Sequence, residues 1–152
     1  MTFDVGDFML QSVPFARTLD ISFDKVEPGF AIARLADRAE LHNHMGGPHA
    51  GVLFSVAETA SGAAMLAAFG DRLSRATPLA VNATIRYVKL ARGEVVAEAR
   101  LQASREEVVA KLDAGERPEF DITVEIRTAD GTLVSEMTVA WTLRINGDAG
   151  AR

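Results

Sequence analysis

The sequence predicts an α+β domain in which one long, apolar helix packs against an antiparallel sheet. The first observation is a run from Gly51 to Gly70 that is rich in apolar and small residues and contains one charged side chain, Glu58. Such a run is typical of a helix surrounded by protein. The second is a change to period-two alternation after Pro78, which indicates strands with one apolar face. A chain of this length is expected to form one domain, residues 1–152.

The N-terminal part is predicted to hold a short helix followed by a hairpin. Apolar residues recur in Val5–Leu19, with Pro14 interrupting, so a short N-terminal helix is expected there. Ile21–Glu27 and Phe30–Leu35 are predicted strands, joined by a Pro-Gly turn. In the first strand the odd-numbered residues are expected to share one face. Residues 36–47 are expected to form a polar loop that ends in two glycines.

The central helix is predicted to begin at Pro48 or His49 and to end at Phe69. Proline is favoured at the first helical position, where its missing N–H costs nothing. The segment is a poor membrane span, because Glu58 lies inside it and no Lys or Arg cluster flanks it closely. We therefore expect a core helix in a soluble protein.

Four alternating segments follow, and together they predict an antiparallel meander. The segments are Val81–Tyr87, Val95–Gln102, Phe120–Arg127 and Leu133–Arg144. Ser104-Arg-Glu-Glu107 fits a capping box, so a helix near residues 105–114 is expected as an insert within one hairpin. Residues 147–152 are expected to be a frayed tail.

Composition narrows the classes of function. The net charge of −5 and the lack of basic runs argue against nucleic-acid binding. No cysteine is present, so disulfides, thiolate nucleophiles and Cys-ligated zinc are excluded. The N-terminus starts with acidic residues and lacks a basic n-region, so a cytoplasmic protein without membrane partners is expected.

Glu58 is the candidate catalytic group. A carboxylate in an apolar helix is costly to bury unless it is paired or its pKa moves. The three histidines of the chain, His42, His44 and His49, lie just upstream. Two other interpretations are an ion pair with Arg86 and a zinc site made by the three histidines, for which the spacing is a weak signal.

The segment around these residues resembles the hotdog-fold acyl-CoA thioesterases of the phenylacetate-pathway type. Their pattern is an Asn, then His-Gly-Gly, then an apolar run that ends in Asp or Glu. The matching residues are Asn43, His49-Ala50-Gly51 and Glu58, with Ala50 in place of the first glycine. The resemblance implies a central helix wrapped by a six-stranded antiparallel sheet. It also implies hydrolysis of an acyl-CoA to acid and thiol, with no metal and no cofactor.

The resemblance also implies how the site is assembled. The N–H groups of Ala50 and Gly51 would hold the thioester oxygen, because helix N-termini present unpaired N–H groups. Glu58 follows His49 by nine residues, about 13 Å along the helix axis, which is too far to serve the same carbonyl. In hotdog dimers the helix start of one subunit faces the acid of the other, so a homodimer is expected, with a dimer of dimers as the alternative assembly. Glu58 would be base or nucleophile, Asn43 would orient water or the loop, and His49 would support the loop.

Further residues are candidates for substrate contact. Thr59 and Asn82 are expected to contact the substrate, and Met65, Leu66 and Phe69 are core or acyl-tunnel residues. Basic side chains that could meet the phosphates of coenzyme A are Arg72, Arg75, Arg86, Lys89 and Arg92.

Two alternative functions are considered. One is a hotdog dehydratase or hydratase that acts on hydroxyacyl or enoyl thioesters, in which His42 would take part. The other is a non-catalytic acyl-CoA-binding module, which is favoured mildly by Ala50 and by Ala80, where the family often has a hydroxyl residue.

Overall fold

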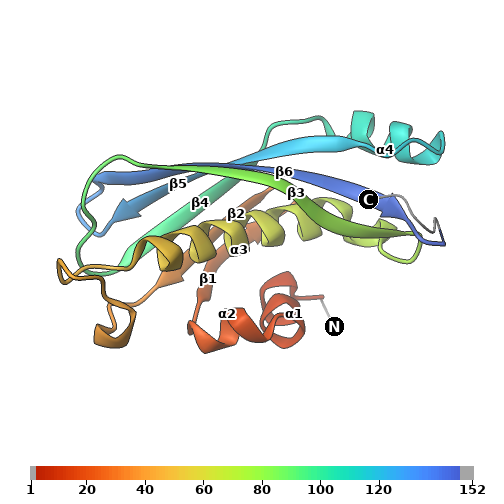
Figure 1. Cartoon of the computed structure of the whole chain (residues 1–152). Coiled ribbons are helices and arrows are strands. Elements are labelled where there is room, and N and C mark those ends of the chain that lie inside the picture. Colours follow the sequence, from red (N-terminus) through yellow and green to blue (C-terminus); the bar gives the residue numbers. More distant parts are fainter. Residues whose placement is uncertain (1–2, 148–152) are drawn as a thin grey trace.

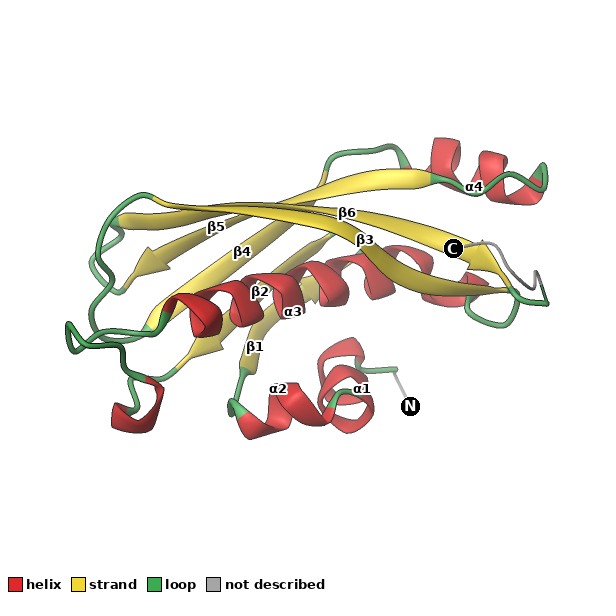
Figure 2. Ribbon diagram, viewed as in Figure 1, coloured by secondary structure: helices red, strands yellow, loops and turns green. Residues whose placement is uncertain are grey.

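The structure is a computed structural model that describes residues 3–147. One antiparallel sheet lies across one side of a long helix, α3 (Ala50–Phe69), as Figures 1 and 2 show. The strands are β1 (Ser22–Glu27), β2 (Phe30–Leu35), β3 (Ala76–Tyr87), β4 (Val95–Leu101), β5 (Glu119–Thr128) and β6 (Leu133–Ile145). The predicted α+β class, with a central helix and a six-stranded antiparallel sheet, is confirmed.

Small side chains allow α3 to lie close to the sheet. In the pairing of β2 with β4, Ala31 lies opposite Ala99 and Ala33 lies opposite Ala97, and all four are fully buried. The helix contributes small residues of its own, including Ala60 and others with no exposed surface. Helix and strand backbones can therefore approach closely while the interior stays filled. The 18-residue window of α3 that is apolar enough to span a membrane is 72% buried, as expected of a core helix.

The strand order differs from the predicted meander in one respect. The order in the sheet is β1-β2-β4-β5-β6-β3, so β4, β5 and β6 do form a meander. β3, however, pairs with β6 at the far edge, and the segment around Arg92-Gly93 is a connection across the sheet rather than a hairpin turn. β3 is also longer than predicted and begins before Pro78. Alternation identifies the two faces of a strand but not the strand beside it.

The N-terminal segment forms two helices rather than one. α1 (Val5–Ser12) ends where Val13 precedes Pro14, and α2 (Pro14–Thr18) begins at the proline. The break follows from proline chemistry, since a residue before proline avoids the helical conformation. Both helices lie on the side of α3 that faces away from the sheet (Figure 1), so α3 is covered from two sides.

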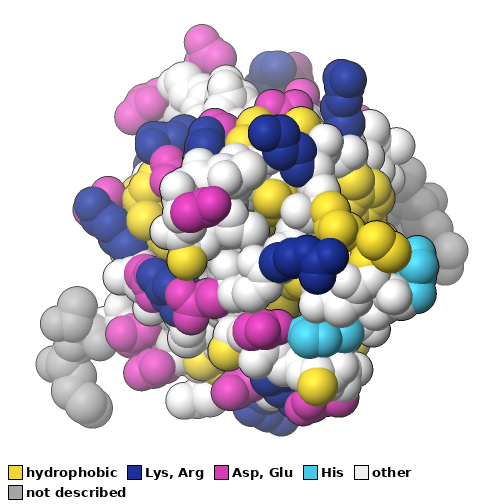
Figure 3. Space-filling model, turned by 90° about the vertical axis from the view of Figure 1, so that its left-hand side faces the viewer, with side chains coloured by type: hydrophobic (Ala, Val, Ile, Leu, Met, Phe, Trp, Pro, Cys, Tyr) yellow, Lys and Arg dark blue, Asp and Glu magenta, His cyan; other side chains and the backbone are white. Residues whose placement is uncertain are grey.

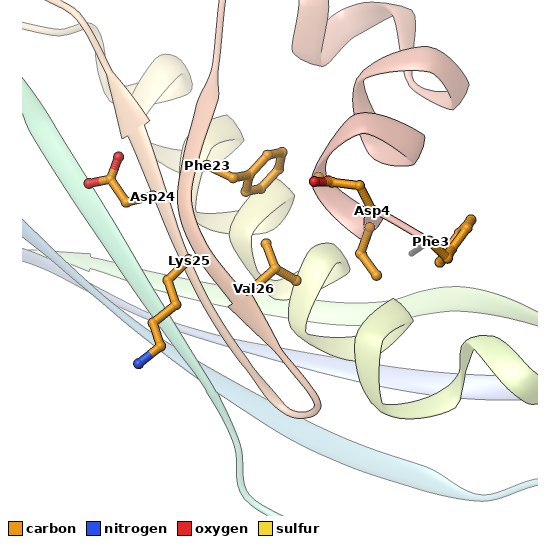
Figure 4. Close-up of a pocket in the computed structure, with 8 residues that line it drawn as sticks. Phe3, Asp4, Phe23, Asp24, Lys25 and Val26 are labelled. Atoms are coloured by element: carbon orange, nitrogen blue, oxygen red, sulfur yellow. The ribbon is translucent and has the colours of Figure 1, made fainter. Parts of the chain in front are cut away.

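A bulge in β1 changes which residues meet α1. The pairing of β1 with β2 shifts register between Phe23 and Lys25. As a result Phe23 and Val26 point toward α1, while Asp24 and Lys25 point the other way (Figure 4). These four residues of β1 contribute to the lining of a pocket of about 250 Å³. The expected strict alternation in this strand is therefore wrong, because one extra residue resets the faces.

The predicted insert is present as α4 (Arg105–Asp113), between β4 and β5. Ser104 caps it by accepting a hydrogen bond from the Glu107 N–H at 3.3 Å. Arg105 anchors the insert to the end of α3, where its Nε donates to the Ala68 carbonyl oxygen at 2.7 Å. Two short 3-10 helices, η1 (Ala39–Leu41) and η2 (Gly70–Arg72), are also present. Residues 148–152 of the predicted frayed tail lie outside the described residues.

Candidate active site

The loop before α3 is organised by Asn43. Its Oδ1 accepts hydrogen bonds from the N–H groups of Met45 at 2.9 Å and Gly47 at 3.2 Å. Its Nδ2 donates to the carbonyl oxygen of Pro48 at 3.3 Å. Asn43 therefore holds the turn that leads into the helix, which is a frequent use of asparagine. This is one of the roles expected of it; orientation of a water molecule stays a prediction.

The same loop packs tightly against the connection between β3 and β4. A Cβ added at Gly47 would lie 2.0 Å from the carbonyl oxygen of Ala91, so only glycine fits there. Arg92 Nη1 donates to the Met45 carbonyl oxygen at 3.0 Å. Figure 3 faces this end of the molecule, where histidine side chains lie near basic and hydrophobic ones. The crossing connection thus fixes the position of the loop.

One N–H group at the start of α3 remains free. His49 is the N-cap, and its Nδ1 accepts from the Gly51 N–H at 2.8 Å. The N–H groups of Val52 and Leu53 both reach the His49 carbonyl oxygen. Within residues 3–147, the Ala50 N–H donates no hydrogen bond. Ala50 is exposed, so this N–H is available to a substrate oxygen, whereas that of Gly51 is already used.

Tyr87, at the end of β3, fixes the helix start from the other side. Its hydroxyl donates to the Ala50 carbonyl oxygen at 3.0 Å. This contact was not foreseen from the sequence, although Tyr87 is the only tyrosine of the chain. Because β3 lies at the edge of the sheet, the contact ties the edge strand to the first turn of α3.

The histidines do not converge on one point. His42 Nε2 lies 2.6 Å from Asp37 Oδ1, and His49 is occupied as the helix cap. Among residues 3–147, no three His, Cys, Asp or Glu side chains are grouped in a way that would hold a metal ion. His44 is exposed in the loop. The histidines therefore serve the loop and the cap, and the geometry lends the zinc interpretation no support.

Glu58 lies half-buried on α3, and burial raises the pKa of its carboxyl above the ordinary glutamate value. In the described part of the chain, its carboxylate has no ion-pair or hydrogen-bond partner, Arg86 included. Removing a carboxylate from water without a partner disfavours the charged form and makes it a stronger base. An unpaired, partly desolvated carboxylate is a common feature of catalytic sites.

Glu58 lines a half-open, mostly apolar cavity of about 260 Å³ between α1, α3 and the sheet. Phe8 and Met9 of α1 and Val13, which follows it, form one wall, and Trp141 of β6 forms another. Thr59, buried and also predicted as a substrate contact, lines the same cavity. Asn82 does not: it is exposed on β3 and lies outside this cavity.

A pair of residues that sequence reasoning missed supports the backbone at Glu58. Ser61 Oγ donates to the Glu58 carbonyl oxygen at 2.7 Å and accepts from Trp141 Nε1 at 3.1 Å. Ser61 is fully buried, so this link holds α3 against β6 beside the carboxylate. Trp141, the only tryptophan, is the one signal in the sequence that could have pointed to it.

The predicted groups therefore lie at two places along α3. Ala50 and Glu58 are separated by eight residues, about 12 Å along the axis. The basic residues are also divided: Arg72 and Arg75 lie beyond the C-terminal end of α3 and pair with Asp71 and Asp113. Arg92 lies at the start of α3. Within one chain, the structure does not bring all these residues to one substrate.

A family model described as a domain of unknown function, DUF4442, matches residues 5–143. The chain belongs to this family. No curated protein matches the sequence. The family description assigns no activity, so the fold and site geometry carry the functional argument.

Solved structures of other proteins share the fold. A protein of unknown function from Pseudomonas aeruginosa, described as a probable thioesterase, has 26% identity and a TM-score of 0.82, over 93% of this chain and 94% of its own. A thioesterase family protein from Silicibacter pomeroyi has 20% identity and a TM-score of 0.76, over 93% and 96%. The PaaI protein of the E. coli phenylacetic acid degradation operon has 21% identity and a TM-score of 0.73, over 93% and 91%. The resemblance to hotdog thioesterases is confirmed, and the fold is the hotdog fold.

Proposed function

We propose that this protein hydrolyses acyl-CoA or related acyl thioesters to a free acid and a thiol. The observation that carries the proposal is the unpaired, half-buried Glu58 carboxylate on the wall of an apolar cavity. The structural neighbour with 26% identity, described as a probable thioesterase, supports this class of reaction. The proposed reaction consumes only water and thioester, and it needs neither a metal nor a cofactor.

In the proposed reaction the Ala50 N–H holds the thioester oxygen as negative charge develops on it. Glu58 either takes a proton from the attacking water or attacks the carbonyl carbon itself. In the second case an anhydride forms, and water then hydrolyses it to the acid and the regenerated carboxylate. In both cases the C–S bond breaks, and the thiolate leaves and takes up a proton. The raised pKa makes Glu58 a better proton acceptor in the first route.

The distance between Ala50 and Glu58 leads us to propose a homodimer in which the site is shared. One subunit would provide Asn43, His49 and Ala50 at its helix start, and the partner would provide Glu58. Support comes from the exposed apolar side chains of β3 and the segment after it: Val81, Tyr87, Val88 and Leu90. An edge strand with such side chains is prone to pair with a second chain. A dimer of dimers is compatible with this arrangement of the shared site. We also propose that the enzyme acts in the cytoplasm.

The test is release of free thiol from a panel of acyl-CoA thioesters by the wild type and by Glu58→Gln. We expect Glu58→Gln to lose at least about 100-fold in kcat, the usual contribution of a general base. Glu119→Gln, an exposed carboxylate at the start of β5, is the matched control and should keep the wild-type rate. Equal rates for wild type and Glu58→Gln would exclude Glu58 as the catalytic carboxylate.

The same panel of acyl-CoA thioesters distinguishes the thioesterase from the two alternative functions, a binding module and a hydratase. No thiol release from any acyl-CoA, together with saturable binding, would favour a binding module. Hydration of an enoyl thioester without thiol release would favour the hydratase.

A further inference from the structure

The cavity beside Glu58 follows one face of α3 toward its C-terminal end. Glu58, Gly62 and Leu66 are spaced by four residues, so their side-chain positions lie above one another on the helix. All three line the cavity. From Glu58 to Leu66 the helix advances by about 12 Å. The cavity therefore extends away from the carboxylate along the helix.

Residue 62 lines the cavity as a glycine, and the side chains of Met9 and Trp141 lie close to its Cα. A Cβ at this position would lie 3.3 Å from Met9 Cε and 3.7 Å from Trp141 Cζ2. Gly62 is a costly choice in the middle of a helix, and here the missing side chain lets Met9 and Trp141 approach α3 without filling the cavity. Any larger side chain at this position would project between α1 and Trp141 and shorten the cavity.

Leu66 lies at the other end of the cavity. It lines this cavity and also a second hollow of about 640 Å³, which opens near Phe3, Pro28 and Arg105. Leu66 itself is buried, with 4% of its surface exposed. Its side chain therefore stands between the two spaces and closes the first.

The lining is apolar and carries no positive charge. Phe8, Met9, Met65, Leu66 and Trp141 dominate it, and no Lys, Arg or His contributes to it. The indole N–H of Trp141 is already bonded to Ser61, so the ring presents only apolar surface. A carboxylate on the acyl group would find no partner here and would face Glu58, so the lining disfavours charged acyl groups.

The volume limits the size of the occupant. The cavity measures about 260 Å³, and a water-sized group takes roughly 30 Å³ in a liquid. About eight or nine non-hydrogen atoms therefore fill it. This is less than a whole drug-sized ligand needs, at about 300 Å³ or more, and the open side of the cavity lets the larger coenzyme extend outside.

We propose that this cavity holds the acyl group of the substrate. The acyl group is uncharged and apolar and has at most about eight or nine non-hydrogen atoms. Gly62 and Leu66 set the limit on its length. This inference rests on the proposed function for its biological meaning. It makes α1, together with α3, the element that selects the acyl group. Gly62 and Leu66 are specificity residues and take no part in bond breaking.

The test uses S-alkyl-CoA thioethers, which cannot be hydrolysed, with butyl, octyl and dodecyl chains. Binding is measured by calorimetry in parallel with turnover of the matching acyl-CoA thioesters. In the wild type, affinity should rise from butyl to octyl and gain nothing further at dodecyl. Gly62→Val should lower the octyl-to-butyl affinity ratio at least about tenfold. Leu66→Ala should open the second hollow and restore a gain from octyl to dodecyl.

Two control variants separate an effect on the cavity from a general effect on folding. Ala110→Val, on the exposed face of α4, adds the same side chain outside the cavity and should keep the wild-type ratio. If Gly62→Val does not fold, Gly62→Ala replaces it, because its Cβ requires only the flexible end of Met9 to move. The proposal is overturned if Gly62 variants weaken all chain lengths equally, or if a carboxyalkyl thioether binds as tightly as octyl-CoA. A preserved alkyl profile without any turnover would contradict the proposed function and leave this inference standing.

Discussion

At the scale of single residues, the free N–H of Ala50 can be removed without removing the helix. Ala50 is the first helical residue, where proline is favoured, and His49 before it is extended with ψ 146°. We expect Ala50→Pro to lower kcat by about 100- to 1000-fold, the usual loss for one oxyanion donor. Ala50→Gly keeps the N–H and is the control. Circular dichroism should show both variants folded, and a loss below threefold in Ala50→Pro would exclude this N–H from the reaction.

Glu58 should also set the pH dependence of the reaction. Burial raises the pKa of its carboxyl, and only the ionised form can accept a proton or attack. The value of kcat/KM should therefore rise with pH through a midpoint above the ordinary glutamate pKa and then level off. The measurement is a pH–rate profile in a buffer of constant ionic strength. A rate that keeps falling as the pH rises through this range would mean that the protonated form is the active one.

The sequence pointed to candidate residues in and before α3, but not to the residues that support them. Glu58 was recognisable because it is the only charge in an apolar helix, and the cost of burying a charge gives that pattern meaning. Asn43 and His49 were found through their order in a motif. Ser61 and Trp141 were not found, because they are 80 residues apart and only the folded chain brings them together.

At the scale of elements, the close contact between the loop before α3 and the β3–β4 connection should be essential. Gly47→Ala would place a Cβ 2.0 Å from the Ala91 carbonyl oxygen, a backbone atom that cannot simply rotate away. We expect a loss of about 2 kcal/mol or more in the free energy of unfolding, measured by urea denaturation. The turn held by Asn43 should shift as well, so activity should fall.

Gly70→Ala is the matched control for this prediction. Gly70 has helical backbone angles, and its nearest neighbour to an added Cβ is 3.9 Å away. Alanine should fit there and stabilise the protein by about 0.4–1 kcal/mol, because it restricts the unfolded chain. Equal effects of the two substitutions would contradict the steric explanation.

The elements themselves were largely predictable, and their neighbours were not. Both hairpin strands, the central helix, the inserted helix and the strands after it were found within a few residues of their observed bounds, whereas β3 begins five residues earlier than predicted. The partner of β3 was not, because alternation records which face is buried, and pairing depends on contacts between distant segments. The bulge in β1 was missed for a related reason, since one extra residue leaves no local signal.

At the scale of the whole molecule, the proposed shared site makes a prediction about mixed dimers. Glu58→Gln and Ala50→Pro homodimers should each be inactive, because every site lacks one group. A mixed dimer has one site with Ala50 from the first chain and Glu58 from the second, and this site is complete. Equal mixing should therefore restore about a quarter of the wild-type rate, since about half of the dimers are mixed and each has one complete site of two.

The experiment co-expresses the two variants with different affinity tags and purifies the mixed species, which should show about half of the wild-type rate because one of its two sites is complete. Its thiol release is compared with that of the two homodimers and of a wild-type preparation that carries the same tags. Mixed dimers that form but show no activity would place both groups in the same subunit's site, and an active wild-type monomer would do the same.

The two ends of α3 differ in how much freedom the surrounding chain has. At the start, the Asn43 loop packs against the Ala91 connection at Gly47, and the Tyr87 hydroxyl bonds to the first turn of the helix. At the other end, the chain leaves α4 through Gly115, which has a φ of +82° and open space around its Cα. Additional sequence can therefore be accommodated between β4 and β5, whereas the β3–β4 connection has a fixed length. A peptide tag or reporter inserted after Gly115 would lie far from the proposed reacting groups. This turn is therefore a suitable insertion point for engineered variants of the protein.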